Sequence, residues 1–162
     1  MILIVKAAEY ILENCPTDLR GNEKTKNFSS KFDVFSQFFN YIHDQVLTDL
    51  DVDVLHTEDD FFDYFMTFFE KTNYLKAHLK KYFLQGLKNP SLYIEHIKIL
   101  RHIGTKLKAI LPQMPESYYY TTFAILPAVL YVWVHDESDD LCHTMKKLQQ
   151  VSSNFANLIF NY

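Results

Sequence analysis

Residues 90–112 read PSLYIEHIKILRHIGTKLKAILP, and this stretch decides the fold. Proline is favoured in the first turn of a helix, so a helix is expected to begin at Pro90 or Ser91, and Pro112 is expected to end it. Between these ends, apolar side chains recur every three or four residues, at Ile94, Ile97, Leu100, Ile103, Leu107 and Ile110. That period is typical of an α-helix with one buried face, and the stretch therefore predicts a long amphipathic helix.

The rest of the chain carries the same helical period. Further helices are expected over residues 2–15, 29–50, 59–73, 74–87, 116–134 and 141–162. The pattern leaves open whether the two pieces that meet at Asn73 form one bent helix. The chain has three glycines, five prolines and no Asn-Gly or Asp-Gly pair, so β-hairpins are not expected. We predict a single all-α domain of seven to eight helices spanning residues 1–162.

Composition narrows the classes of function. The 14 Phe and 11 Tyr suit a core of bulky helices that encloses something rather than a small Leu/Ala bundle, and an AT-rich genome that favours Phe and Tyr codons explains part of this content. The net charge of -4 and the lack of a long basic tract argue against nucleic-acid binding by neutralisation of phosphates. Cys15 and Cys142 have no partner at a metal-binding or redox spacing, so both are read as reduced thiols of a cytoplasmic protein.

No membrane span and no secretory signal peptide are expected. The apolar start of the chain is interrupted by Lys6 and Glu9. Residues 117–134 contain no charged side chain and lie at the lower length limit for a transmembrane helix. Three consecutive tyrosines, two threonines and Pro127 make this segment a poor span, so a helix buried inside an α domain is the favoured interpretation.

Three short segments together resemble the haem site of globins. Lys76-Ala77-His78 matches the segment that carries the distal histidine, and Ile103-Gly104-Thr105-Lys106-Leu107 matches the one that carries the proximal histidine. Pro115-Glu116-Ser117-Tyr118 follows where the next globin helix begins, although one extra residue precedes it. His78 and Leu107 are 29 positions apart, close to the globin spacing. The resemblance covers about residues 73–162 and implies a globin-like bundle.

The resemblance departs from haem globins at the iron ligand. Leu107 stands in the proximal position, and leucine has no lone pair to offer iron. His96 lies on nearly the same helical face as Leu107 but about 16 Å away along the axis, and His102 is rotated by roughly 140° from it. Neither histidine can replace the missing ligand, so no haem is expected.

A globin pocket without haem resembles the non-haem sensor domains of spore-forming bacilli. These domains form the sensor part of a sporulation histidine kinase and also occur as stand-alone sporulation-inhibitory proteins. The resemblance implies a fatty acid in the vacated pocket, a bound halide such as chloride, and inhibition of sporulation by competition for the signal of the kinase. It also implies, by analogy with sensor globins, a homodimer formed through residues 116–162.

The residues suggest an orientation for such a fatty acid. Lys81 is three residues from His78 on the same helical face, so the two side chains could hold a carboxylate. The alkyl tail would then run past Leu107. Arg101 is a second candidate contact for the carboxylate, and Tyr82 and Ile103 are candidate lining residues. The alternatives are a solvated Lys81, a core-edge His78 bonded to a backbone carbonyl, and an ordinary core leucine at position 107.

Other classes of function have weaker support. No nucleophile with a base, carboxylate pair or glycine-rich loop has a persuasive spacing, so we expect no enzyme. His135 and His143 flank the acidic turn 136–140, which could hold a metal, but a solvated turn is favoured. The alternative is a bundle like the viral apoptosis inhibitors, in which a hydrophobic helix such as 117–134 underlies a groove for a partner helix. The Asn-Trp-Gly-Arg motif of that group is absent, since the only tryptophan is Trp133.

Overall fold

The computed structural model describes residues 2–16, 18–86, 88–111, 127–138 and 140–159, which form helices joined by turns and loops, with no strand among them. The elements are α1 (Ile2–Asn14), α2 (Lys31–Leu50), α3 (Glu58–Thr72), the 3-10 turn η1 (Asn73–Leu75), α4 (Lys76–Gly86), α5 (Pro90–Ile110) and α7 (Cys142–Ile159). Residues 127–135 form a further helical stretch, here called the 127–135 helix. The all-α prediction is confirmed, whereas a globin-like bundle of seven to eight helices is not confirmed by the described residues.

Side-chain caps explain where several helices begin. The Ser30 hydroxyl accepts a hydrogen bond from the Asp33 amide at the start of α2. Thr57 and Asp60 form a capping box at the start of α3, in which each side chain accepts a hydrogen bond from the other's backbone amide. Asn89 caps α5 just before Pro90, which confirms the predicted start of that helix. The break predicted at Asn73 is the turn η1, which joins α3 to α4.

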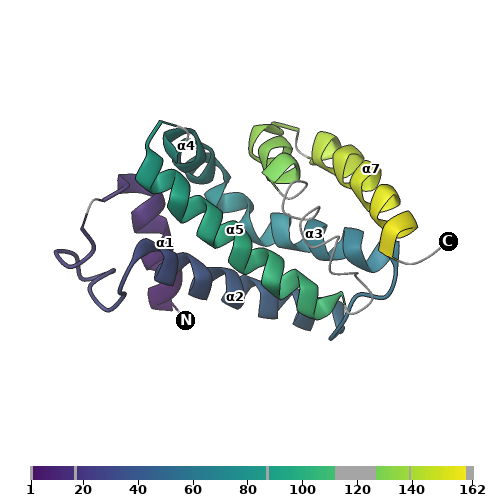
Figure 1. Ribbon diagram of the computed structural model, residues 1–162, viewed down its shortest axis with the longest axis horizontal. Coiled ribbons are helices and arrows are strands. Elements are labelled where there is room, and N and C mark those ends of the chain that lie inside the picture. The colour runs from purple at the N-terminus through teal and green to yellow at the C-terminus, as the bar shows by residue number, and fades with distance from the viewer. Residues whose placement is uncertain (1, 17, 87, 112–126, 139, 160–162) are drawn as a thin grey trace.

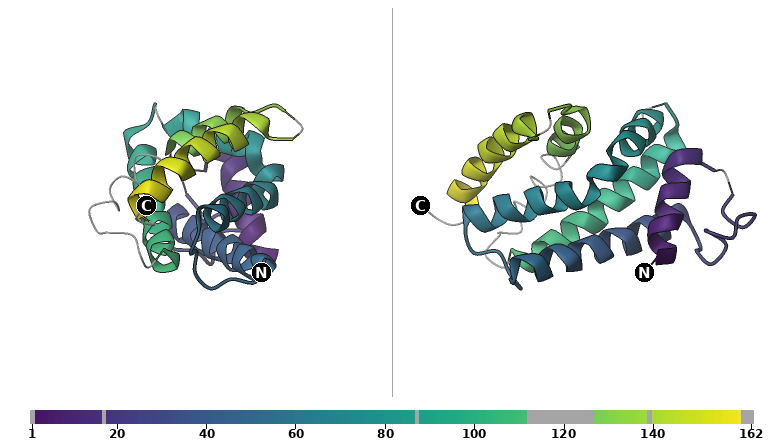
Figure 2. Two further views of the ribbon diagram at one scale, coloured as in Figure 1. Left: turned by 90° about the vertical axis from the view of Figure 1, so that its right-hand side faces the viewer. Right: turned by 180° about the vertical axis from the view of Figure 1, so that it is seen from behind.

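The helices pack in three levels (Figures 1 and 2). In Figure 1, α2 lies along the bottom, α3 and α5 occupy the middle, and α4, the 127–135 helix and α7 lie along the top. Contacts join α2 to α1, α3 and α5, while α3 also contacts α7, and α4 contacts α1 and α5. α4 and α5 each have a side that faces the 127–135 helix. In this arrangement, those two sides lie close to the upper surface.

Aromatic side chains fill the space between the levels. Phe69 of α3 stacks on Trp133 of the 127–135 helix with ring centroids 5.0 Å apart, and both residues are buried. Between α2 and α3, His43 Nδ1 lies 2.7 Å from the Tyr64 hydroxyl, and this pair is also buried. Burial lowers the pKa of His43 and raises that of Tyr64, so both groups are neutral near pH 7.

Two sequence predictions fall partly outside the described residues. The expected helix 116–134 is described only from residue 127, so a kink at Pro127 cannot be placed, and the expected dimer face 116–162 is described only in part. In the part of the chain that the structure describes, no helix has the length and apolar character needed to cross a bilayer.

Candidate functional site

The two residues predicted to hold a carboxylate both face α1. His78 Nε2 lies 3.9 Å from the Glu13 carboxylate, and the His78 side chain is 40% exposed. Lys81 is exposed, and its ammonium group donates a hydrogen bond to the Glu13 backbone carbonyl at 3.3 Å. The structure therefore brings His78 and Lys81 together, at the end of α1.

The residues predicted to line the tail of the ligand lie elsewhere. Leu107 is completely buried, and with Ile103 it borders a cavity of about 10 Å³ that no residue of α4 lines. Such a volume is that of a single water site. Tyr82 is buried between Phe35 and His96, and Arg101 is exposed on α5. Among the described residues, then, the predicted head-group contacts and the predicted tail contacts do not border one cavity.

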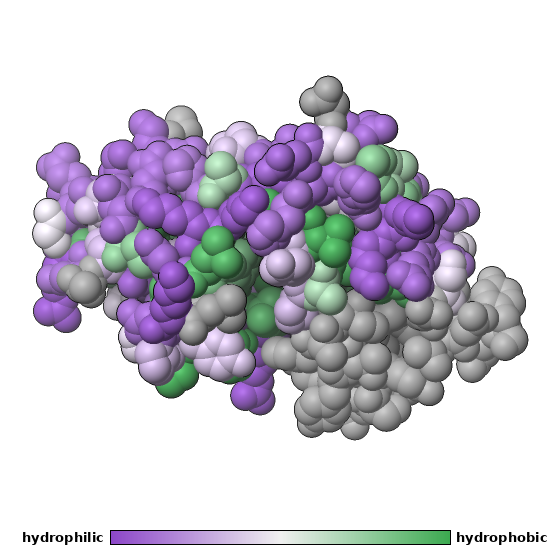
Figure 3. Space-filling view, turned by 90° about the horizontal axis from the view of Figure 1, so that it is seen from above, coloured by the Kyte–Doolittle hydropathy of each residue, from purple (hydrophilic) through white to green (hydrophobic). Residues whose placement is uncertain are grey.

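A larger apolar hollow lies between α4, α5 and the 127–135 helix, and we call it the α4–α5 groove. Its volume is about 250 Å³, and the side chains that shape it are mainly apolar, including Leu84, Tyr93, Ile97, Leu100, Leu130 and Tyr131. Figure 3 shows the upper face of the molecule, where apolar side chains are exposed near the middle with hydrophilic ones on either side. The groove is a concave apolar site of the kind that binds ligands in other proteins.

Four large apolar side chains of the groove remain open to solvent. Leu84 is 44% exposed, Tyr93 51%, Ile97 43% and Tyr131 62%. Single exposed apolar residues are common on soluble proteins, but four around one hollow form a patch of the kind found at interaction sites. The groove is therefore the described feature best suited to binding.

His96 lines the groove and is almost completely buried among aromatic rings. It is 8% exposed, and its ring lies 4.7 Å from the ring of Tyr82 and 5.3 Å from that of Phe83. Burial lowers the pKa of His96 to about 4, with a smaller contribution from Lys31, so the imidazole is neutral near pH 7. Its Nε2 has no hydrogen-bond partner among the described residues. A bound ligand could supply that partner, which would recover the cost of an unsatisfied buried polar atom.

Gly86 allows α4 to approach His96 closely. A Cβ atom at position 86 would lie 2.1 Å from His96 Cε1, far inside contact distance, and the imidazole is held by neighbouring aromatic rings. Alanine ordinarily stabilises a helix relative to glycine by up to about 1 kcal/mol. Here we expect Gly86→Ala to destabilise the protein by about 1 to 2 kcal/mol, because the imidazole must move. Urea unfolding measures this difference.

Gly21 provides the matched control for that variant. A Cβ atom there would have nothing within 4 Å, and no described glycine has a positive φ. Gly21→Ala should therefore leave stability unchanged or raise it by about 0.5 kcal/mol. Equal effects of the two substitutions would show that the contact between Gly86 and His96 is not tight.

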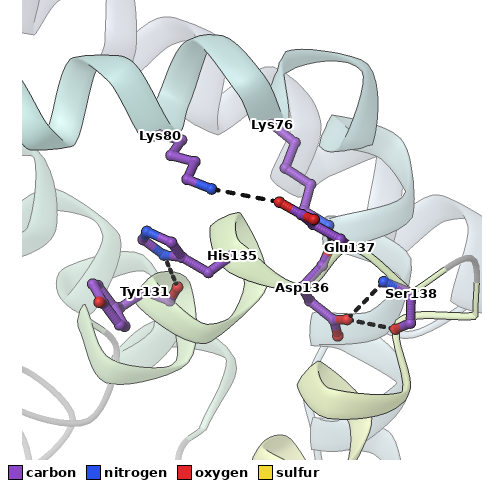
Figure 4. Close-up of polar contacts among 7 residues, drawn as sticks. All are labelled: Lys76, Lys80, Tyr131, His135, Asp136, Glu137 and Ser138. Atoms are coloured by element: carbon purple, nitrogen blue, oxygen red, sulfur yellow. Dashed lines mark hydrogen bonds and ion pairs between the residues drawn. The ribbon is translucent and has the colours of Figure 1, made fainter.

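The turn that follows the 127–135 helix lies beside α4, as the contacts in Figure 4 show. Lys80 and His135 both line the groove. The Lys80 ammonium group is 3.9 Å from the Glu137 carboxylate, and His135 Nδ1 is 2.8 Å from the Tyr131 carbonyl. Lys76 donates a hydrogen bond to the backbone carbonyl of Asp136. Two lysines of α4 thus contact the turn.

Asp136 differs from the solvated acid expected in this turn, since it is only 2% exposed. One carboxylate oxygen accepts hydrogen bonds from the amide and hydroxyl of Ser138, and the other accepts from the amide and hydroxyl of Thr144 at 2.6 and 2.7 Å. Burial raises the pKa of Asp136, but these hydrogen bonds outweigh it and hold the pKa well below its usual range. Within the described ranges, no three His, Cys, Asp or Glu side chains are grouped to hold a metal.

His96 is not predicted from the sequence as a ligand-binding residue, although the helical period indicates its position on the inner face of α5. His96 shares a helical face with Leu107, and both are buried. The groove itself had no comparable signal, because Leu84, Ile97 and Tyr131 have the same apolar pattern as core residues. Which apolar side chains stay uncovered depends on how the helices pack.

Comparisons with known proteins do not identify this chain. No family model, curated protein or solved structure matches it. The geometry of the α4–α5 groove therefore carries the functional argument.

Proposed function

We propose that the protein is a non-catalytic binding protein whose α4–α5 groove accepts an amphipathic helix of a partner protein. The observation that carries this proposal is the group of four large side chains, each 43% to 62% exposed, around one hollow of about 250 Å³. Tyr93, Ile97 and Leu100 lie at helical spacing along α5, so they present one continuous apolar face. Helix-in-groove recognition uses such a face to contact apolar side chains of a partner helix.

Substitution of Ile97 tests this function. Ile97→Asp places a charge in the groove, so we expect the affinity for an amphipathic helical peptide to fall tenfold or more, roughly the effect of losing an interface hot spot. The peptide is selected from a displayed library of amphipathic helices against the wild-type protein, and binding is followed by fluorescence anisotropy.

Ile94→Asp is the matched control for Ile97→Asp. Ile94 is 54% exposed on the same helix, and it is not among the residues that line the groove. We expect Ile94→Asp to leave the affinity within about twofold of wild type. If the two variants bind the selected peptide equally well, the groove is not its binding site.

Fatty-acid binding, which the resemblance to non-haem globin sensors implies, is a second proposal. Its support is that Lys80 and His135 are among the residues that line an apolar groove, where a carboxylate could meet the ammonium group while the alkyl chain follows Phe83 and Leu100. In this proposal the protein is a cytoplasmic globin-like sensor that opposes a sporulation kinase. Lipid extraction and native mass spectrometry of the purified protein should then reveal a bound fatty acid, and a ligand-free protein that binds no added fatty acid would contradict it.

A further inference from the structure

Charge is unevenly distributed around the α4–α5 groove. Residues 71–94 carry five lysines and no aspartate or glutamate, although the whole chain has a net charge of -4. This segment contains α4 and the first turns of α5. Lys71 lies on α3 and pairs with Asp49, and Lys76 donates to the Asp136 carbonyl, so a basic surface beside the groove rests on Lys80, Lys81 and Lys88.

The basic surface is continuous with the apolar groove. A second, shallow hollow of about 340 Å³ lies over α4, and three lysines line it, namely Lys80, Lys81 and Lys88. Lys80 and Leu84 line both hollows. They are four residues apart on one face of α4, so an occupant of the groove would meet an apolar side chain and an ammonium group about one helical turn apart, about 6 Å along the axis.

These lysines are available to an external partner. Lys81 and Lys88 are exposed, and within the described part of the chain neither forms an ion pair; the Lys81 ammonium group donates one hydrogen bond, to the Glu13 carbonyl at 3.3 Å. Among the described residues, Lys80 pairs with Glu137, at 3.9 Å, and the Glu137 side chain is 88% exposed. Exposed pairs of this kind contribute little to stability, so a partner carboxylate can replace Glu137 at small cost.

We propose that the helix bound in the α4–α5 groove is acidic on the flank that lies over α4, with its carboxylates near Lys80, Lys81 and Lys88. This inference rests on the proposed helix-binding function. Complementary charge chiefly raises the association rate and selects among partners, and its effect weakens as salt is added. A protein helix is favoured over a lipid surface because the apolar side chains line a hollow, whereas insertion into a bilayer needs them to project.

Two peptides separate charge recognition from apolar recognition. They share the apolar positions of the selected helix, and one carries glutamate on its flanks where the other carries glutamine. At low salt, we expect the glutamate peptide to bind the wild-type protein roughly tenfold more tightly, and we expect this advantage to shrink at high salt. Equal affinities for the two peptides would overturn the inference and leave the helix-binding function intact.

Charge reversal on the protein gives the second arm of the test. Lys81→Glu with Lys88→Glu should abolish the advantage of the glutamate peptide and leave the glutamine peptide within about twofold of its wild-type affinity. Lys146→Glu with Lys147→Glu on α7 changes the net charge equally and should preserve the advantage. If the α4 variant does not fold, Lys81→Gln with Lys88→Gln replaces it. Equal losses for both peptides, or equal losses in both double variants, would overturn the inference.

Three further outcomes are decisive, and the last two of them identify other occupants of the groove. If no amphipathic peptide binds the wild-type protein, the helix-binding function itself fails. Binding to phosphatidylserine vesicles that requires Lys81 and Lys88, without any peptide binding, would overturn the inference in favour of an anionic lipid surface. A fatty acid and the glutamine peptide are each added to the bound glutamate peptide. If the fatty acid displaces it and the glutamine peptide does not, the inference is overturned in favour of a simple carboxylate site.

Discussion

Replacing Asp136 with alanine should lower the free energy of unfolding by about 3 to 5 kcal/mol, because buried donors lose a charged acceptor. The Asp136 carboxylate accepts hydrogen bonds from both the amide and the hydroxyl of Ser138 and of Thr144. Thr144 lies in the first turn of α7, so the variant also loses a negative charge close to the start of that helix. We expect the melting temperature to fall by about 10 °C, as measured by circular dichroism.

Glu137→Ala is the matched control for Asp136→Ala. Glu137 is the next residue, but its side chain is 88% exposed and its ion pair with Lys80 spans 3.9 Å. Exposed pairs of this kind contribute about 0.5 kcal/mol or less, so the control should unfold within 2 °C or so of wild type. Similar losses in both variants would mean that the Asp136 carboxylate is not the group that holds the turn.

Lowering the pH from 7 to 4.5 should destabilise the protein by about 2 to 3 kcal/mol through His96 alone. The unfolded chain takes up a proton on this histidine below pH 6.5, whereas burial lowers the pKa in the folded protein to about 4. Over that window the unfolded state binds more protons than the folded state, so stability falls as the pH falls. Burial also lowers the pKa of His43, which acts in the same direction.

Urea unfolding at a series of pH values measures this dependence. The variant His96→Asn removes the titrating group, so its stability should change less between pH 7 and pH 4.5 than that of wild type, even if it is less stable throughout. Identical slopes for the two proteins would show that His96 becomes protonated as readily in the folded state as in the unfolded one.

The helices could be predicted from the sequence because their signals are local. The apolar period of residues 90–110 and the proline at position 90 predict α5, and the apolar period of residues 29–50 predicts α2. Each of these signals involves residues within a few turns of one another. The all-α class followed from the same local patterns.

The candidate site could not be predicted in the same way, because it depends on which helices become neighbours. Helical phase places Leu107 on a buried face but does not say that the space beside it is only about 10 Å³. The acidic turn illustrates the same point. Asp136 was read as solvated, and its burial depends on Thr144, eight residues later, folding back as the first turn of α7.

The stacking of Trp133 on Phe69 gives the molecule its own optical reporter. Trp133 is the only tryptophan of the chain, so fluorescence that is excited at the long-wavelength edge of tryptophan absorption comes from a single indole. That indole belongs to the helix that also contributes Leu130 and Tyr131 to the groove. A ligand that pushes this helix away from α3 should shift the emission while the far-ultraviolet signal stays constant, so movement of the groove wall can be followed in the unlabelled protein.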